Sequence, residues 1–496
     1  MKTTKTNFWV RSISIAICLS FLGCGVAESS TSPPTNCPDI NAPPGTGYDL
    51  TQTAFLFNFV ANASSNVSGN PQMLADFEYA VLTNGTVTPS PYYGYDDTVK
   101  ASYNVRAKGL LKTLGPQLIG GDWQLVWGPG NYQILGSKGK SDNSAFVVHS
   151  PSQDAYILAI AGTNANGLLD WLVEDFLVGP EFLVKWPMTT QQAPGLPLVL
   201  LPPVTIPVGQ VVPTDRMIAT GTAYGVYLLL TNMVQSQYAP TPKLTLQGFL
   251  SQLEQNTNGT TKLIVTGHSL GGALSPTVAN WARDTLVGKD PRWGNHVFAL
   301  PTAGPTPGNA AYAADWDAKF PQCAVAVNSG NIVNSLNALV YNQADVVPHA
   351  WQYIYKELAV KEDSYYFWLF FPTTDKHYDV ESQIGKLSLP QNKDSDALVA
   401  VVAYAERAGR LAGMTTQSGR IEINDATLYP RSAWPIQYLD NKNNNAPMLY
   451  AKPNAPVTSL SVFFNTLGMV HVWGYWSAFN MEPASVSNAL PVRIYN

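Results

Sequence analysis

Short apolar stretches alternate with longer amphipathic ones from about residue 48 onward. The short stretches have the length of strands and are bounded by glycine, asparagine or serine, whereas the longer ones suit helices. Buried strands that alternate with helices are typical of a mainly parallel central sheet flanked by helices, so the pattern predicts an α/β fold. The predicted strands are 123–129, 143–150, 154–163, 261–267, 295–304 and 334–345, and the predicted helices include 99–114 and 217–233.

Two stretches depart from this alternation. Residues 186–213 are apolar but rich in proline, which excludes a helix and makes a central strand unfavourable. Residues 357–460 contain an aromatic run and then a more polar section, with one helix expected near 395–412. We interpret them as insertions, an apolar lid-like one at about 177–215 and one in the C-terminal half at 357–460, within a single domain that spans 48–496.

The N-terminal residues have the pattern of a signal peptide. A basic beginning is followed by ten apolar residues, 13–22, which is too short a run to span a bilayer. The sequence Phe-Leu-Gly-Cys at 21–24 resembles a bacterial lipobox, which predicts a lipoprotein-type signal peptide at 1–23 and a lipid on Cys24. An ordinary signal peptide cut near Ala27 is the alternative.

Residues 24–47 are rich in serine, threonine, proline and glycine and have no period, so we expect a flexible tether. Of the four cysteines, Cys37 and Cys323 remain once the signal peptide and Cys24 are set aside. In an oxidising compartment they could form a disulfide, and the alternative is two unpaired buried thiols.

Composition restricts the partners. Charged residues make up only 13% of the chain, about half the usual share, and the formal net charge is −5. No large basic field exists, so we expect no nucleic-acid partner. Neutral or apolar ligands and an extracytoplasmic protein, either membrane-anchored or secreted, fit this composition better.

The sequence "IVTGHSLGGALS", residues 264–275, contains a candidate nucleophile. Gly267 and Gly271 flank Ser269 at two positions on either side, which lets a strand turn sharply into a helix and hold the hydroxyl at the tip. An apolar strand precedes the motif and a helix-compatible sequence follows it. The alternative is a plain glycine-rich turn. Pro276 is expected to kink the helix or remove one of its hydrogen bonds.

A serine nucleophile of this kind needs a base, and in chain order Ser, then Asp or Glu, then His is expected. His471, in "LGMVHVWGYW", is the favoured base, and a structural core histidine is the alternative. The other histidines are less suitable. His149 and His296 are excluded by chain order or by a strand-like position. His349 lies close to the acid, His377 lies in a solvated setting, and the turn is expected to direct the ring of His268 away.

The acid is expected at the end of a strand after the nucleophile, which selects Asp345, with a solvated strand-end carboxylate as the alternative. Asp315 and Asp317 are weaker candidates in a helix-like segment. For the oxyanion, the backbone N–H of Leu270 and of Thr163 are the expected donors, unless residues near Thr163 form only a turn. No cluster of cysteine and histidine ligands is evident, so no metal or cofactor is required.

These motifs together resemble the class 3, fungal-type triacylglycerol lipases of the α/β-hydrolase superfamily, with this chain as a divergent, bacterial lipoprotein-like member. The similar stretches are "AGTNANGLLDWLVEDF", "IVTGHSLGGALS", "TAGPTPGNAAYA", "NQADVVPHAW" and "HVWGYW". The resemblance implies an α/β-hydrolase fold, a triad of Ser269, Asp345 and His471, and a lid at 168–176 that the apolar segment extends to Pro213. A loop packed on the domain surface is the alternative to the lid.

The expected function is hydrolysis of carboxylic esters of lipids at an interface, through an acyl-enzyme intermediate. A phospholipase or polyester hydrolase with the same triad is one alternative. A non-catalytic surface lipoprotein that uses the fold for binding is another. The membrane is an expected partner through the lipid on Cys24.

Overall fold

The computed structural model describes most of the central sheet and its helices, together with parts of the two segments predicted as insertions. The described residues are 37–40, 47–64, 67–83, 109–134, 139–162, 180–191, 198–256, 260–286, 292–323, 326–328, 331–342, 345, 347–349, 412–414, 420–423, 439–440, 446–447, 471 and 474–481. Several predictions therefore lie outside the described residues, namely the signal peptide, Cys24, Thr163, the lid at 168–176, most of the helix at 99–114 and nearly all of the helix near 395–412.

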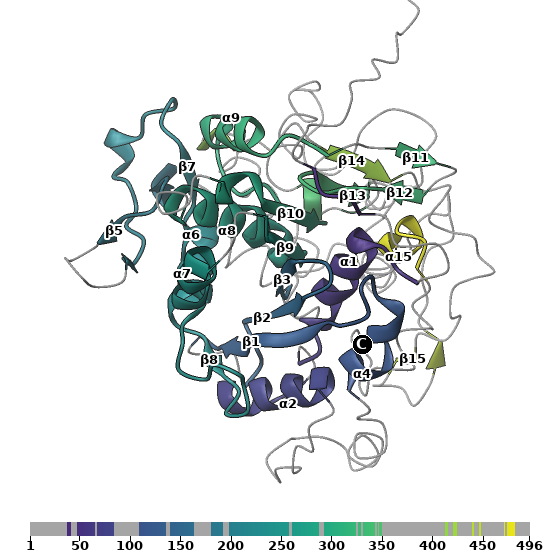
Figure 1. Ribbon diagram of the computed structural model, residues 1–496. Helices are drawn as coiled ribbons and strands as arrows, with labels where there is room; N and C mark the ends of the chain where they lie inside the picture. Colours follow the sequence, from purple (N-terminus) through teal and green to yellow (C-terminus); the bar gives the residue numbers. More distant parts are fainter. Residues whose placement is uncertain are drawn as a thin grey trace, which may run out of the picture.

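An eight-stranded mixed sheet forms the centre of the described part, in the order β14-β13-β10-β9-β3-β2-β1-β8 (Figure 1). The strands from β3 to β14 pair in parallel, whereas β3, β2, β1 and β8 pair antiparallel. Their bounds are β1 Gln124–Tyr132, β2 Asn143–Ser150, β3 Ala155–Ile160, β8 Val234–Gln235, β9 Lys262–His268, β10 Val297–Thr302, β13 Leu339–Asn342 and β14 Arg420–Ile423.

The predicted strands overlap those of this sheet, and the α/β expectation is confirmed. The predicted strand 334–345 is shorter in the structure, where β13 covers only Leu339–Asn342. Strand β14 belongs to the central sheet although it lies within the predicted insertion at 357–460, so this part of the segment is not an insertion. One predicted helix, 217–233, is corrected at its start, because Met217–Ala219 form strand β7 and only Thr220–Thr231 form helix α6. Strand β7 pairs with β4, Leu183–Lys185, so tertiary hydrogen bonds determine the conformation of these three residues. Of the predicted helix 99–114, the described part contains the short helix α4, Leu110–Thr113.

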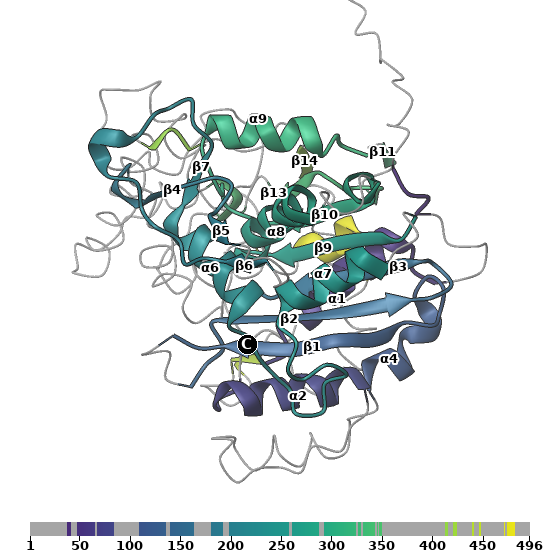
Figure 2. The ribbon, with the colours of Figure 1, turned by 60° about the vertical axis from the view of Figure 1, so that its left-hand side comes forward.

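Helices cover both faces of the sheet (Figure 2). Side chains alternate between two cores, as the period of two in a strand requires: Val147 packs with α6, α7 and α8, and Val148 packs with α1 and α2. The helices are α1 Leu50–Val60, α2 Pro71–Thr83, α7 Leu246–Asn256, α8 Leu270–Leu286, α9 Ala310–Lys319 and α15 Gly474–Ala478. The smaller strands are β5 Thr190–Gln191, β6 Val199–Leu200, β11 Ala326–Asn328, β12 Asn331–Val333, β15 Leu439–Asp440 and β16 Ala446–Pro447.

Helix α1 joins the N-terminal part of the domain to the segment near the C-terminus. A capping box starts the helix, in which Asp49 accepts from the Gln52 backbone and Gln52 accepts from the Asp49 backbone. The Gln52 amide also donates to the carbonyl of Phe479 at 2.7 Å, and the ring of Phe55 stacks on that of Phe479 at 4.1 Å between centroids. These contacts hold α15 against α1 and the sheet, as Figure 1 shows.

Cys37 and Cys323 form a disulfide, so the first of the two alternatives for these residues is the correct one. The bond joins positions 286 residues apart and therefore restricts the unfolded chain strongly. In the described part, no helix is both long enough and apolar enough to cross a bilayer.

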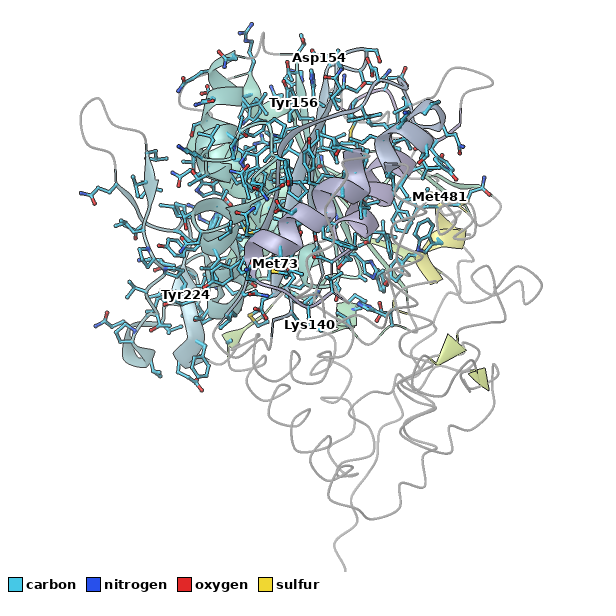
Figure 3. All side chains as sticks on the ribbon, turned by 90° about the horizontal axis from the view of Figure 1, so that it is seen from below. Met73, Lys140, Asp154, Tyr156, Tyr224 and Met481 are labelled. Carbon is cyan, nitrogen blue, oxygen red and sulfur yellow. A yellow bond between two sulfur atoms is a disulfide. The ribbon has the colours of Figure 1, made fainter. Side chains whose placement is uncertain are left out.

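A buried carboxyl group lies between α2 and the sheet. Glu78 is 1% exposed and accepts hydrogen bonds from the Ser64 hydroxyl, from the Ser144 hydroxyl at 2.5 Å and from the Asn131 amide at 3.1 Å. Figure 3 shows α2, marked by Met73, lying across this face. Burial raises the pKa of Glu78 to about 8, although the three hydrogen bonds act in the opposite direction.

This shift predicts a pH-dependent stability. The folded protein holds a proton on Glu78 up to about pH 8, whereas the unfolded chain releases it near its ordinary pKa of 4.5. The unfolded state therefore gains stability as pH rises between these values, and the free energy of unfolding falls, by at most on the order of 1.4 kcal/mol per unit of pKa shift.

We expect Glu78→Gln, which mimics the protonated form, to flatten this decline. Urea denaturation of both proteins at several pH values between about 5 and 8 measures the difference. Asp122→Asn is a control, because the pKa of Asp122 is lowered and this carboxyl is ionised throughout the range. An equal decline in the wild type and in Glu78→Gln would contradict the assignment.

Candidate functional site

The site lies where three neighbouring strands end at the same level. Ile160 of β3 pairs with Gly267 of β9, and Thr302 of β10 pairs with His268 of β9. The carboxyl ends of parallel strands are where open α/β sheets carry their ligand-binding residues. Ser269 follows β9 directly and precedes the first residue of α8.

Ser269 occupies a backbone conformation that non-glycine residues rarely adopt. Its φ is 61°, in the left-handed region, and the residue is 4% exposed. Two backbone hydrogen bonds hold this conformation, from the Ser269 N–H to the Thr302 carbonyl at 3.1 Å and from the Gly272 N–H to the Ser269 carbonyl at 2.8 Å. Such maintained strain at a strand-to-helix turn is characteristic of a nucleophile elbow.

The glycines of the motif are required by close backbone packing. A Cβ atom on Gly267 would lie 2.2 Å from the Gly271 carbonyl oxygen, and a Cβ atom on Gly271 would lie 2.5 Å from the Ile160 carbonyl oxygen. Both distances are far below van der Waals contact, and the obstructing atoms are backbone atoms that cannot move aside. Glycine at Gly267 and Gly271 therefore allows the elbow to form against β3.

Pro276 does not end α8, which runs unbroken from Leu270 to Leu286. Proline has no N–H to donate to the carbonyl four residues earlier, which is that of Gly272. This carbonyl faces the next loop closely, because a Cβ atom on Gly304 would lie 2.4 Å from its oxygen. The cost of Pro276 is thus one helical hydrogen bond rather than a break in the helix.

Asp345 and His471 meet although 126 residues separate them. The Nδ1 atom of His471 lies 2.7 Å from Oδ2 of Asp345, whose carboxylate is fully buried. The Tyr475 hydroxyl donates to the same oxygen at 2.8 Å, and the Val347 N–H donates to Oδ1 at 3.1 Å. A carboxylate can only accept, so Nδ1 of His471 is the protonated nitrogen and Nε2 carries the lone pair.

The Nε2 atom of His471 is the part of the ring that remains for chemistry. It is buried and has no hydrogen-bond partner within the described structure. A buried nitrogen lone pair without a donor is costly, and such exceptions gather at functional positions. The His471 ring lies 4.8 Å from that of His268, the residue immediately before Ser269, so His471 is next to the elbow.

His268 differs from the sequence-based expectation. The turn does not direct its ring away from the site, because the ring packs between His471, Phe59 of α1 and Tyr475 at centroid distances of 4.8, 4.8 and 5.1 Å. Its Nδ1 atom lies 2.9 Å from the Thr302 hydroxyl. Burial and the neighbouring His471 hold the pKa of His268 well below its usual range, so the ring is neutral and packs against the candidate base.

Of the two expected oxyanion donors, only Leu270 lies within the described residues. Gly162 lies directly against Ser269, since a Cβ atom there would be 3.0 Å from the Cβ of Ser269 and 2.7 Å from the His268 carbonyl oxygen. Thr163, the next residue, lies outside the described residues. Leu270 is the first residue of α8, so its N–H has no acceptor within the helix and is free to bind a negative oxygen.

The weaker candidates have other roles. Asp315, on α9, is paired with Arg216 at 2.6 Å and with Lys319 at 2.7 Å. Burial alone would raise the pKa of Asp315, but the hydrogen bond and charge of Lys319 and the charge of Arg216 lower it. His149, on β2, stacks on Tyr156 at 4.0 Å. Both residues have structural partners, whereas His377 lies outside the described residues.

One contributor was missed at the level of sequence. Tyr475 lies four residues after His471, and a spacing of four on a helix-like segment brings two side chains to one side. This spacing in "HVWGYW" was a usable signal. Among the described residues, no group of three or more histidine, cysteine, aspartate or glutamate side chains could hold a metal ion.

Comparisons with known proteins find lipases. The family described as lipase (class 3) matches residues 232–353, which include Ser269 and Asp345 but not His471. Comparison with curated proteins finds no match. The crystal structure of M37 lipase superposes with a TM-score of 0.51 and 21% identity over 88% of this chain and 95% of that chain.

A second solved structure, a lipase from Rhizopus microsporus var. chinensis, has 16% identity and a TM-score of 0.30 over 64% of this chain and 75% of its own. At these identities the structural likeness concerns the fold, for which the M37 lipase comparison is the informative one. The chain therefore has the α/β-hydrolase fold, and its residues 232–353 match the class 3 lipase family.

Proposed function

We propose that this protein hydrolyses carboxylic esters of lipids with Ser269 as nucleophile, His471 as general base and Asp345 as the residue that orients the base. The observation that carries this proposal is the buried hydrogen bond between Nδ1 of His471 and Asp345, which leaves the Nε2 lone pair free beside the elbow. The class 3 lipase match supports a lipid ester as the substrate class.

The reaction proceeds in two halves. Nε2 of His471 accepts the proton of the Ser269 hydroxyl while the oxygen attacks the acyl carbon, and the Asp345 carboxylate stabilises the charged imidazole. The tetrahedral oxyanion is bound by the N–H groups of Leu270 and Thr163. His471 then protonates the leaving alcohol, which departs and leaves the acyl group on Ser269. Water, activated by the same nitrogen, releases the acid.

A non-catalytic binding role does not account for two costly features of the site. A strained φ at Ser269 and an unpartnered buried Nε2 at His471 both reduce stability. Neither feature is needed to bind a lipid.

Hydrolysis of triglyceride and of phospholipid emulsions by the same preparation then separates a triacylglycerol lipase from a phospholipase.

The first prediction concerns the nucleophile. A fluorophosphonate probe should label the wild type, and Ser269→Ala should abolish labelling and lower kcat on p-nitrophenyl esters by at least about 10³-fold. Ser275→Ala is the matched control, because Ser275 lies on the same helix, is buried and has a hydroxyl without a hydrogen-bond partner among the described residues. Labelling that survives in Ser269→Ala would contradict the mechanism.

The second prediction concerns the support of the acid. Tyr475→Phe removes one donor to Asp345 but keeps the ring that packs on His268. We expect kcat to fall about 3- to 10-fold with KM nearly unchanged, because the lost hydrogen bond stabilises the charged state formed during the reaction.

Tyr312→Phe is the control for this variant. It also deletes a buried hydroxyl, one that donates to Thr277 between α9 and α8, away from the reacting groups. Its kcat should equal that of the wild type. Equal losses of kcat in Tyr312→Phe and Tyr475→Phe would show that the effect is general destabilisation, and the role of Tyr475 would be wrong.

We further propose that the protein is extracytoplasmic and is held at a membrane by a lipid on Cys24, with full secretion as the competing outcome. The support is the lipobox-like sequence at 21–24 and the disulfide, which requires an oxidising compartment. Growth with a clickable palmitate should label the wild type but not Cys24→Ser. Equal labelling of the two proteins, or none of either, would exclude the anchor.

A further inference from the structure

The proline-rich insertion presents an unusual apolar surface. We call residues 198–216 the valine lobe. Figure 1 shows β5 and the adjoining chain on the left of the view, away from the central sheet. Four valines of the lobe keep between 45% and 78% of their surface exposed, although valine is ordinarily a core residue. They are Val199, Val204, Val208 and Val212, at 51%, 78%, 61% and 45%.

The inner side of the lobe is firmly attached. Leu200 is buried in the core that contains α6, α7 and α8, and Ile206 packs against it. The side chain of Gln247 on α7 makes two hydrogen bonds to the backbone of the lobe. It accepts from the Leu200 N–H at 3.3 Å and donates to the Leu198 carbonyl. The Ile206 N–H donates to the Leu183 carbonyl of β4 at 2.8 Å. These contacts attach this part of the insertion to the domain.

The base of the lobe is attached to the loop that follows β10. The Asn309 side chain accepts from the Met217 N–H at 3.1 Å and donates to the Asp215 carbonyl at 2.8 Å. Asn309 closes the loop after β10, and the same loop contains Gly304, whose backbone packs on α8 near Ser269. In Figure 3, Asp154 and Tyr156 mark the start of β3. The exposed Tyr224 of α6 lies toward the opposite side of that view.

Charge indicates what the lobe can contact. No charged residue occurs from 188 to 214, whereas the base carries Lys185 paired with Asp215 at 3.0 Å and Arg216 paired with Asp315. An ionic or nucleic-acid partner would need charges at the tip. Exposed valines on a proline-stiffened chain instead suit an apolar phase, because burial there costs little conformational entropy.

We propose that the valine lobe is a fixed docking element for an uncharged lipid surface, which it contacts with Val199, Val204, Val208 and Val212 while the elbow faces that surface. The proposal rests on the proposed function, since it takes the lipid ester phase as the occupant.

The test measures binding without turnover. Every protein carries Ser269→Ala, and also Cys24→Ser so that a lipid on that residue cannot contribute. The lobe variant adds Val204→Ser, Val208→Ser and Val212→Ser. The matched control removes three exposed apolar side chains outside the lobe, with Ile134→Ser, Val234→Ser and Tyr238→Ser. Flotation with phosphatidylcholine vesicles and with triolein emulsion gives the partition coefficient.

The lobe variant should partition at least about tenfold less than the control variant. Phosphatidylglycerol or added salt should change binding by less than about twofold, because the contact is uncharged. Equal partitioning of the two variants would overturn the proposal, and so would binding that depends on the anionic lipid. Sedimentation that shows a wild-type dimer dissociated by the lobe substitutions would overturn it too, since the lobe would then contact a second copy.

The failure of this proposal is distinguishable from failure of the proposed function. With Ser269 intact, the lobe variant should retain wild-type kcat/KM on a soluble p-nitrophenyl ester and lose activity on triolein in proportion to its lost binding. Full triolein activity in the lobe variant would remove the docking role and leave the triad assignment standing. Absence of ester hydrolysis in the wild type on both substrates would remove the proposed function itself.

Discussion

The hydrogen bond between His471 and Asp345 is the interaction on which the site depends. It joins a strand end of the central sheet to a segment 126 residues later, inside a region where neither group contacts water freely. An isolated buried carboxylate would be strongly unfavourable, and three donors, from His471, Tyr475 and Val347, offset that cost. The same contacts determine which nitrogen of the imidazole carries the proton.

Helix α1 and the elbow hold this bond in place from two sides. Phe59 of α1 packs on both His268 and Trp476, at 4.8 and 5.0 Å, so one aromatic side chain touches the elbow and the segment after the base. The Asn58 amide reaches the hydroxyls of Thr266 and Thr302 at the strand ends. Residues near the N-terminus of the domain thereby fix the geometry of residues near its C-terminus, and the disulfide of Cys323 with Cys37 adds a covalent tie.

Sequence patterns predicted what local chemistry and chain order determine. The glycine spacing around Ser269 predicted the elbow, and the order of the triad selected Asp345 and His471, which the structure brings together. The antiparallel pairing of β2 with β3 is also predictable from the sequence, because the four residues between them are too few for a parallel crossover. The strand at Met217, the inward ring of His268 and the exposed face of the valine lobe depend on tertiary packing, which no local pattern reports.

The central claim is that Ser269 becomes acylated during turnover while His471, oriented by Asp345, accepts its proton. Rapid quenching of the reaction with a slowly hydrolysed ester, followed by mass spectrometry of the intact protein and of its peptides, tests this claim most directly. The account predicts a mass increase equal to one acyl group, located on the peptide that contains Ser269 and absent when His471 is replaced by alanine. Sustained hydrolysis with no adduct under these conditions, or an adduct on another residue, would contradict it.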